Sequence, residues 1–229
     1  MTAGTGHGDW HRDGWHLVPG FLSAAELTML RDEAERLLAR TDLFEQRGAV
    51  VNSTRRSDRL DPVIDVSPSF AAVARDGRLP ALVNDFLDGQ AQLFKDKFIA
   101  KPPGAIGYIA HQDGAYWPGM GLDPARFLTA IIFLDDANAD NGAIECAANP
   151  YRQLLTDPGQ IADVDESELG DFQVIEAKAG DLLLLHAFTP HRSGPNRSQS
   201  MRRTLLFTYG VDARPDLYGI YQRLRSAGE

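Results

Sequence analysis

From residue 92 onward the sequence alternates short apolar runs with turn-forming residues, and this pattern constrains the fold more than any other feature. Residue pairs such as Asn141-Gly142 and Gly180-Asp181 separate the runs, as is typical of consecutive antiparallel strands. A series of short strands of this kind predicts a β-barrel or a β-sandwich. The expected strands cover residues 93–101, 106–110, 129–134, 143–147, 172–177, 182–186 and 204–209.

The segment before residue 92 predicts helices, apart from one apolar strand at residues 14–18. Ser23 and Glu26 have the spacing of a capping box, and the apolar residues that follow recur at helical spacing. Residues 69–74 and 79–87 are predicted to form two more helices. Because the helices come first and the strands afterwards, we expect an α+β chain, mainly β, with helices on one face of the strands.

Length, charge and cysteine content limit the class of protein. The chain has 229 residues, which predicts a single domain spanning residues 1–229. Its formal net charge of -9 argues against nucleic acid and anionic membranes as partners and leaves a small-molecule ligand. Cys146 is the only cysteine, and no apolar run reaches membrane-spanning length, so we expect a cytoplasmic protein. The acidic segment 163–168 is predicted to be a solvated loop or a short helix, and nothing in the sequence indicates an oligomeric state.

His111 and Asp113 are the first candidate metal ligands. Residues two apart on a strand point to the same face, where an imidazole and a carboxylate can bind one metal ion. His11 and Asp13 have the same spacing but lie in a charged stretch without an apolar strand. His111 instead follows the apolar run 106–110, so we predict His111 as a ligand and His11 as a surface residue.

A site with two histidines and one carboxylate needs a second histidine from another strand. His186 and His191 both qualify by their positions among the last predicted strands. An arginine beside such a site can bind a carboxylate through two parallel hydrogen bonds. Arg202 and Arg203 precede the final strand, and since neighbouring side chains on a strand face opposite ways, only one of them can point inward.

Several short motifs also lie in an order and at spacings that resemble a known family. They are His11-Arg12-Asp13-Gly14-Trp15, residues 17–23, Lys101-Pro102-Pro103-Gly104, His111-Gln112-Asp113 with Tyr116-Trp117, Asp135-Asp136 to Asn141-Gly142, Ala179-Gly180-Asp181, and residues 191–198 with Arg202. The chain resembles the phytanoyl-CoA dioxygenase-like family of iron(II)- and 2-oxoglutarate-dependent oxygenases, which includes ectoine hydroxylase. The family's fold is a double-stranded β-helix, a jelly-roll or cupin-like barrel with flanking helices.

The resemblance implies a set of site residues and cofactors. His111, Asp113 and His191 would bind the iron, and Arg202 would bind the C5 carboxylate of 2-oxoglutarate. His186 and Arg203 are then left without these roles. The implied cofactors are Fe(II), 2-oxoglutarate as co-substrate, and O2. Weaker candidates for 2-oxoglutarate contacts are Ser193, Trp117, Thr129 and Lys97, and the candidates for substrate contacts are Tyr116, Glu145 and Asn196.

The resemblance also implies a reaction. It predicts hydroxylation of an unactivated carbon of a small-molecule metabolite or natural-product intermediate, with release of succinate and CO2. Asp113 excludes the related halogenases, in which a small residue replaces this carboxylate. Desaturation, cyclisation and epimerisation remain alternatives, as do a zinc hydrolase and a non-catalytic cupin-like barrel that binds a metal or a small molecule. Residues 146–152 depart from the family's usual turn, so we expect a different substrate rim.

Overall fold

The structure of the chain is a computed structural model that describes residues 9–46, 58–117, 120–148, 153–155, 169–212 and 214–226. The acidic segment 163–168 and residues 149–152 of the expected rim lie outside these ranges. In the described part of the chain, no helix is long and apolar enough to cross a membrane.

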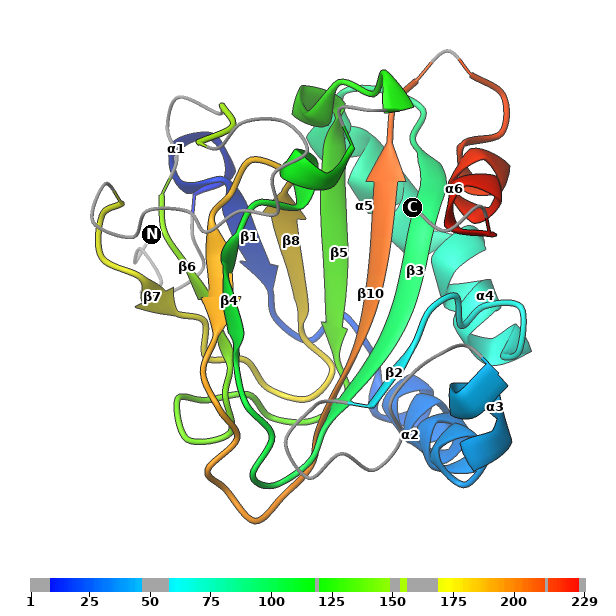
Figure 1. Ribbon diagram of the computed structural model, residues 1–229, viewed down its shortest axis with the longest axis vertical. Coiled ribbons are helices and arrows are strands. Elements are labelled where there is room, and N and C mark those ends of the chain that lie inside the picture. Colours follow the sequence, from blue (N-terminus) through cyan, green and yellow to red (C-terminus); the bar gives the residue numbers. More distant parts are fainter. Residues whose placement is uncertain are drawn as a thin grey trace.

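Two antiparallel sheets face each other and form the body of the molecule (Figure 1). The larger sheet has the strand order β1-β8-β5-β10-β3-β2, and the smaller sheet has the order β4-β9-β6-β7. This arrangement is the double-stranded β-helix, so the predicted fold class is confirmed. The strands of the larger sheet are β1 Trp15–Val18, β8 Leu182–His186, β5 Phe127–Phe133, β10 Arg202–Gly210, β3 Gln92–Lys101 and β2 Asp58–Leu60; those of the smaller sheet are β4 Tyr108–His111, β9 His191–Ser193, β6 Ile144–Cys146 and β7 Gln173–Val174.

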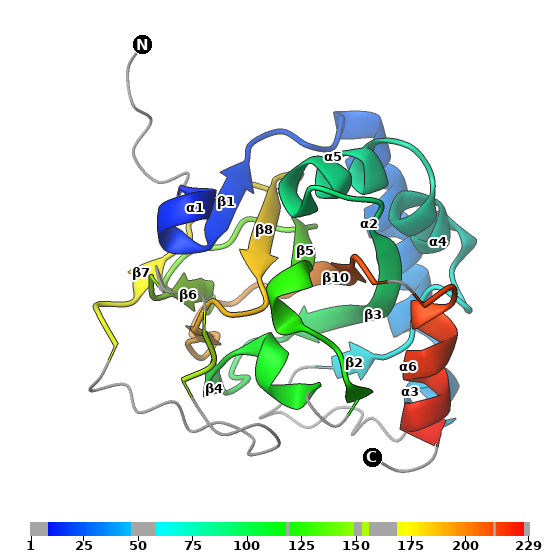
Figure 2. The same cartoon turned by 90° about the horizontal axis from the view of Figure 1, so that it is seen from above.

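Helices cover the outer face of the larger sheet, while the smaller sheet lies on its other side (Figure 2). The capping box is present at the start of α2, because Ser23 Oγ accepts from the backbone N–H of Glu26 and the Glu26 carboxylate accepts from the N–H of Ser23. The helices are α1 Trp10–Asp13, α2 Ala24–Leu38, α3 Thr41–Gln46, α4 Pro68–Arg75, α5 Arg78–Leu87 and α6 Leu217–Ser226, with short 3-10 helices η1 Asp113–Tyr116 and η3 Pro124–Arg126.

Strand β5 shows why the central strands read as continuous apolar runs. Leu128, Ala130 and Ile132 pack in the cluster beneath the helices, whereas Ile131 and Phe133 pack in the cluster between the two sheets. Both faces of the strand are therefore covered, and all its residues are buried. The same alternation on β3 and β10 directs every second side chain toward the space between the sheets, where the site lies.

Several short elements were not predicted, and their size explains why. Strands β2 and β9 have three residues each, too few to show an alternating pattern. The predicted strand at 172–177 is reduced to β7, with Ala177 forming an isolated bridge to Ala137. The short helices α1 and α3 were likewise unpredicted, and so was the ten-residue α6, whose length does not explain the omission. His11, which we expected in a charged stretch without an apolar strand, lies on α1.

Candidate metal centre

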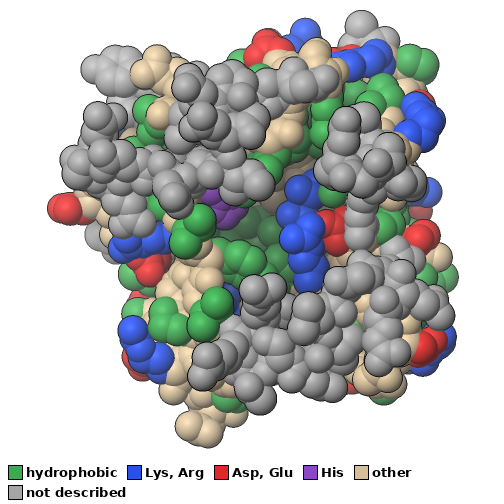
Figure 3. Space-filling view, in the orientation of Figure 1, with side chains coloured by type: hydrophobic (Ala, Val, Ile, Leu, Met, Phe, Trp, Pro, Cys, Tyr) green, Lys and Arg blue, Asp and Glu red, His purple; other side chains and the backbone are tan. Residues whose placement is uncertain are grey.

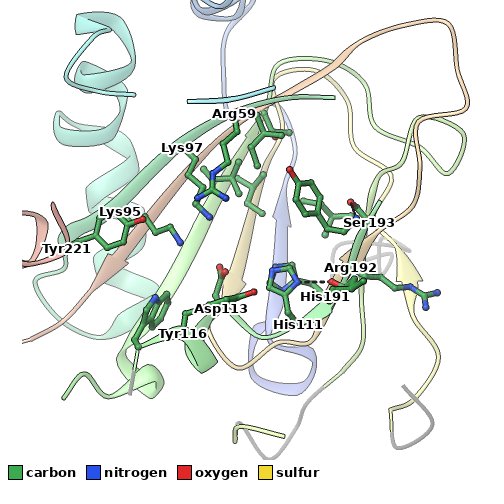
Figure 4. Close-up of a pocket in the computed structure, with 18 of the residues that line it drawn as sticks. Arg59, Lys95, Lys97, His111, Asp113, Tyr116, His191, Arg192, Ser193 and Tyr221 are labelled. Carbon is green, nitrogen blue, oxygen red and sulfur yellow. Dashed lines mark hydrogen bonds between the residues drawn. The ribbon is translucent and has the colours of Figure 1, made fainter. Parts of the chain in front are cut away.

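Three side chains predicted as metal ligands converge at one end of the space between the sheets (Figure 4). His111 ends β4 and pairs in register with His191, the first residue of β9. Asp113 begins η1, two residues after His111. One ligand atom from each of the three residues lies within 4.8 Å of the others, and the two imidazole centroids are 4.2 Å apart.

Backbone carbonyls fix the orientation of both imidazoles. His111 Nδ1 lies 2.9 Å from the carbonyl oxygen of Ile109, and His191 Nδ1 lies 3.0 Å from that of Thr189. A carbonyl can only accept a hydrogen bond, so each Nδ1 carries the proton and donates. Each Nε2 then keeps its lone pair for a metal ion, an arrangement common in metal-binding histidines.

Two threonines support the carboxylate of Asp113. Thr129 Oγ1 donates a 2.8 Å hydrogen bond to Asp113 Oδ2 and lies 3.0 Å from Thr208 Oγ1. The two threonines face each other across the β5–β10 pair. Thr129 was predicted to contact 2-oxoglutarate, but its hydroxyl is engaged with Asp113, so its position suits alignment of this carboxylate.

The electrostatic environment favours the protonation states that a metal ion requires. Burial, together with the neighbouring His191, lowers the pKa of His111 to about 4. Burial acts to raise the pKa of Asp113, but the electrostatic influence of His191 and of the nearby Lys95 and Lys97 outweighs it and holds this pKa well below its ordinary value. At neutral pH His111 is therefore neutral and Asp113 is ionised, and both can donate electron pairs to a cation.

The three side chains line a cavity of about 450 Å³ between the sheets. Figure 3 shows it as a hollow with histidine on one side, a strip of Lys and Arg on the other and apolar side chains at its base. Arg202, Ser193 and Thr204 also line it, from β10 and β9. The cavity therefore places cationic and hydroxyl groups in the same space as the three ligand side chains.

The neighbouring residues Arg202 and Arg203 point to opposite faces of β10. Arg202 points into the cavity and is 3% exposed, and its Nε has no hydrogen-bond partner in the described part of the chain. Burial lowers its pKa to about 10, so Arg202 stays charged at neutral pH. Arg203 points outward and forms a bidentate ion pair with Asp135 and a contact with Glu35.

The other predicted site residues divide into two groups. Trp117, Ser193, Lys97 and Tyr116 all line the cavity. Glu145 and Asn196 do not line it, so the structure gives no support to their predicted substrate contacts. Glu145 pairs with Arg192, and the buried Asn196 amide donates to the carbonyls of Lys101 and Ser200.

His186 and His11, which we did not predict as ligands, lie outside the metal cluster. His186 is buried, its Nε2 lies 3.2 Å from the carbonyl of Ala125, and its Nδ1 accepts from the N–H of Phe188. His11 is exposed on α1, and the carboxylate of Asp13 accepts two hydrogen bonds from Arg12. Both residues take the positions expected of non-ligands.

The cavity residues that were not predicted from the sequence include Arg59 on β2, Lys95 on β3 and Tyr221 on α6. Lys95 lies two residues before Lys97, so strand alternation already puts the two on one face. Arg59 and Tyr221 had no comparable signal, because neither β2 nor α6 was predicted.

These features define a class of protein. Two imidazoles and one carboxylate on one side of a double-stranded β-helix are the ligand set of mononuclear iron oxygenases. The donor set suits iron(II), and the unpaired, buried Nε of Arg202 suits a carboxylate of a 2-oxo acid. The site therefore has the form found in iron- and 2-oxoglutarate-dependent oxygenases.

Comparison with known proteins identifies the family. The family model described as phytanoyl-CoA dioxygenase (PhyH) matches residues 10–204, and the chain belongs to this family. Methylphosphonate hydroxylase of Gimesia maris is 28% identical over 217 residues, which cover 91% of this chain and 80% of that protein. Ectoine dioxygenase of Halomonas elongata is 27% identical over 223 residues, with coverage of 87% and 67%.

Among solved structures, the epimerase SnoN from nogalamycin biosynthesis, in complex with Fe3+, alpha-ketoglutarate and nogalamycin RO, has a TM-score of 0.72. It is 23% identical, and the match covers 88% of this chain and 80% of that one. Family membership and the geometry of the site together identify the protein as an iron- and 2-oxoglutarate-dependent dioxygenase. The resemblance noted in the sequence is thereby confirmed.

Proposed function

We propose that the protein hydroxylates an unactivated carbon of a small-molecule metabolite or natural-product intermediate. The balanced reaction consumes the substrate C–H bond, O2 and 2-oxoglutarate, and yields the alcohol, succinate and CO2. One oxygen atom enters the product and the other enters succinate. The proposal rests on one observation. The clustered side chains of His111, Asp113 and His191 line the same cavity as Arg202.

Each residue has a role in this proposal. His111, Asp113 and His191 would hold iron(II), the two histidines through Nε2 and Asp113 through a carboxylate oxygen. The iron, once bound, supplies the oxidation of the substrate C–H bond. Arg202 binds the C5 carboxylate of 2-oxoglutarate, and Ser193 and Trp117 bound the same part of the cavity.

The relatives support a small substrate but differ in what they act on. Their names indicate methylphosphonate hydroxylation and ectoine oxidation. The similar fold of an epimerase keeps a different oxidative outcome open as the second candidate function. The nature of the product distinguishes these functions.

The test supplies iron(II), 2-oxoglutarate and O2 with a panel of metabolites and measures succinate and product by mass spectrometry. A substrate that stimulates succinate release should give a product heavier by one oxygen atom, derived from O2 labelled with 18O. A product that has lost two hydrogen atoms would indicate desaturation or cyclisation, and an isomer of unchanged mass would indicate epimerisation. Failure to bind 2-oxoglutarate at saturating iron would contradict the whole proposal.

A further inference from the structure

One wall of the cavity carries three cationic side chains that the proposed chemistry does not use. Arg59 from β2 and Lys95 and Lys97 from β3 point into the cavity, across from His111 and His191 (Figure 4). Alternation along β3 places both lysines on the inner face of the larger sheet. We call Arg59, Lys95 and Lys97 the cationic wall.

The cationic wall carries more positive charge than the carboxylates near it can neutralise. Arg59 forms an ion pair with the buried carboxylate of Asp61. Lys95 and Lys97 make no hydrogen bond or ion pair with any residue in the described ranges, and the ammonium of Lys95 lies 5.6 Å from the ring centroid of Tyr221. Asp113 is the only carboxylate among the described residues that line the cavity, and it belongs to the metal cluster.

The charged side chains of the cationic wall interact electrostatically with one another and with Asp113 of the metal cluster. Burial and the charges of Lys95 and Arg59 hold the pKa of Lys97 well below its ordinary value. Lys95 and Lys97 in turn help to lower the pKa of Asp113. Like charges held this close in a concave site favour a bound anion, because an anion removes the repulsion between them.

A charge count of the loaded site indicates how large the anionic charge should be. An iron(II) ion, the Asp113 carboxylate, a 2-oxoglutarate dianion and Arg202 together carry no net charge. Arg192 also lines the cavity, but its charge is offset by Glu145. When Arg59, Lys95 and Lys97 are all protonated, as beside a bound anion, their three positive charges and the single carboxylate of Asp61 leave two positive charges without a counter-charge.

We propose that the cavity binds its substrate through a dianionic oxyanion headgroup of the phosphonate or phosphate monoester type, held by Arg59, Lys95 and Lys97. This inference rests on the proposed function, because it assigns the substrate class of the same cavity. The headgroup lies against the cationic wall, and the organic part extends toward the metal cluster, where its carbon is oxidised. The guanidinium of Arg59 and the two ammonium groups supply charge-assisted hydrogen bonds to the headgroup oxygens.

Binding can be measured without turnover by isothermal titration calorimetry. The probes are propylphosphonate, propyl phosphate and propanesulfonate, which share a chain length but differ in headgroup charge. Each is titrated into the metal-free protein and into the nickel-loaded protein with 2-oxoglutarate. We expect both dianions to bind at least tenfold more tightly than the sulfonate monoanion, and the comparison between the two dianions shows which headgroup the site prefers. Equal affinity for all three probes, or no binding, would overturn the inference.

Substitutions identify the wall as the binding site. Lys95→Met and Lys97→Met keep the apolar stems and remove the charges, and each should weaken propylphosphonate binding about tenfold. Neither lysine forms a hydrogen bond or an ion pair with a residue in the described ranges, so both variants should fold, which circular dichroism can verify. Lys178→Met is the matched control, because Lys178 is 81% exposed and pairs with Asp136 outside the cavity.

The binding of 2-oxoglutarate to the nickel-loaded protein separates this inference from the proposed function. We expect its affinity to be unchanged in Lys95→Met, because Lys95 is not a candidate for a 2-oxoglutarate contact. If Lys97→Met weakens 2-oxoglutarate but not propylphosphonate, Lys97 serves the co-substrate and the inference is wrong. If the wild type fails to bind 2-oxoglutarate, the proposed function fails, while the titrations of the metal-free protein still decide whether the wall binds dianions.

Discussion

At the scale of single residues, Arg202 and Arg203 show how strand geometry assigns different roles to neighbours of the same type. Arg202 faces the cavity and has no acidic partner among the described residues, whereas Arg203 is held on the outer face by Asp135. The guanidinium of Arg202 is therefore available to an incoming carboxylate, and that of Arg203 is not.

We predict that Arg202→Ala raises the KM for 2-oxoglutarate about 100-fold, since it removes a charge-assisted, two-pronged hydrogen bond. Arg203→Ala should leave this KM unchanged and should lower the free energy of unfolding, because Asp135 loses its bidentate partner and keeps only the longer contact with Arg31. Succinate release at varied 2-oxoglutarate concentrations measures the first effect, and urea denaturation measures the second. Equal effects of the two substitutions on KM would show that Arg202 does not bind the co-substrate.

Thr129 acts on the metal cluster through Asp113. Thr129→Val removes the hydroxyl that donates to Oδ2 and keeps the shape of the side chain, so the affinity for iron(II) should fall about 10-fold to 100-fold. Thr129→Ser retains the hydroxyl and is the matched control. Metal titration in the absence of O2 distinguishes the two variants, and an unchanged affinity in Thr129→Val would remove the assigned role.

At the scale of elements, the pairing of β4 with β9 brings the two histidines together. His111 pairs with His191, and Tyr108 pairs with Ser193. Gly107 precedes this pair, and a Cβ at Gly107 would lie 2.0 Å from the carbonyl oxygen of Ser193. Close approach of the two strands therefore requires glycine at this position.

We predict that Gly107→Ala forces β4 away from β9, lowers the free energy of unfolding by about 1–3 kcal/mol and weakens metal binding. Gly170→Ala is the control, because among the described residues other than Gly170 and its chain neighbours, none has an atom within 4 Å of a Cβ at this position. Urea denaturation and metal titration of both variants measure the two effects. Wild-type metal affinity in Gly107→Ala would mean that this strand contact does not position the histidines.

The strands differ in how well the sequence alone predicts them. Turn pairs and apolar runs were sufficient for the central strands, since burial on both faces makes β5 and β8 mostly apolar. They were insufficient for β9, a three-residue strand of polar composition that carries His191. The residues alone left His186 and His191 as equal candidates, and only the family resemblance favoured the residue that the structure places in the cluster.

For the whole molecule, the net charge and the charge of the cavity have opposite signs. The chain carries a formal charge of -9, but its cavity is lined by Arg59, Lys95, Lys97 and Arg202 with Asp113 as the only carboxylate among the described residues. The net charge, from which we predicted that polyanions are not partners, therefore says nothing about a small anion. The cationic side chains come from β2, β3 and β10, which meet only in the folded sheet.

We infer that the folded chain assembles one site for iron(II) and 2-oxoglutarate from β4, η1, β9 and β10. The most direct measurement is the visible spectrum of the protein after anaerobic addition of iron(II) and then 2-oxoglutarate. We expect a weak charge-transfer band that needs both additions and disappears in His111→Ala. We expect the same band in His186→Ala, provided that this variant folds. Absence of the band, together with no binding of 2-oxoglutarate at saturating iron, would show that the chain has no such site.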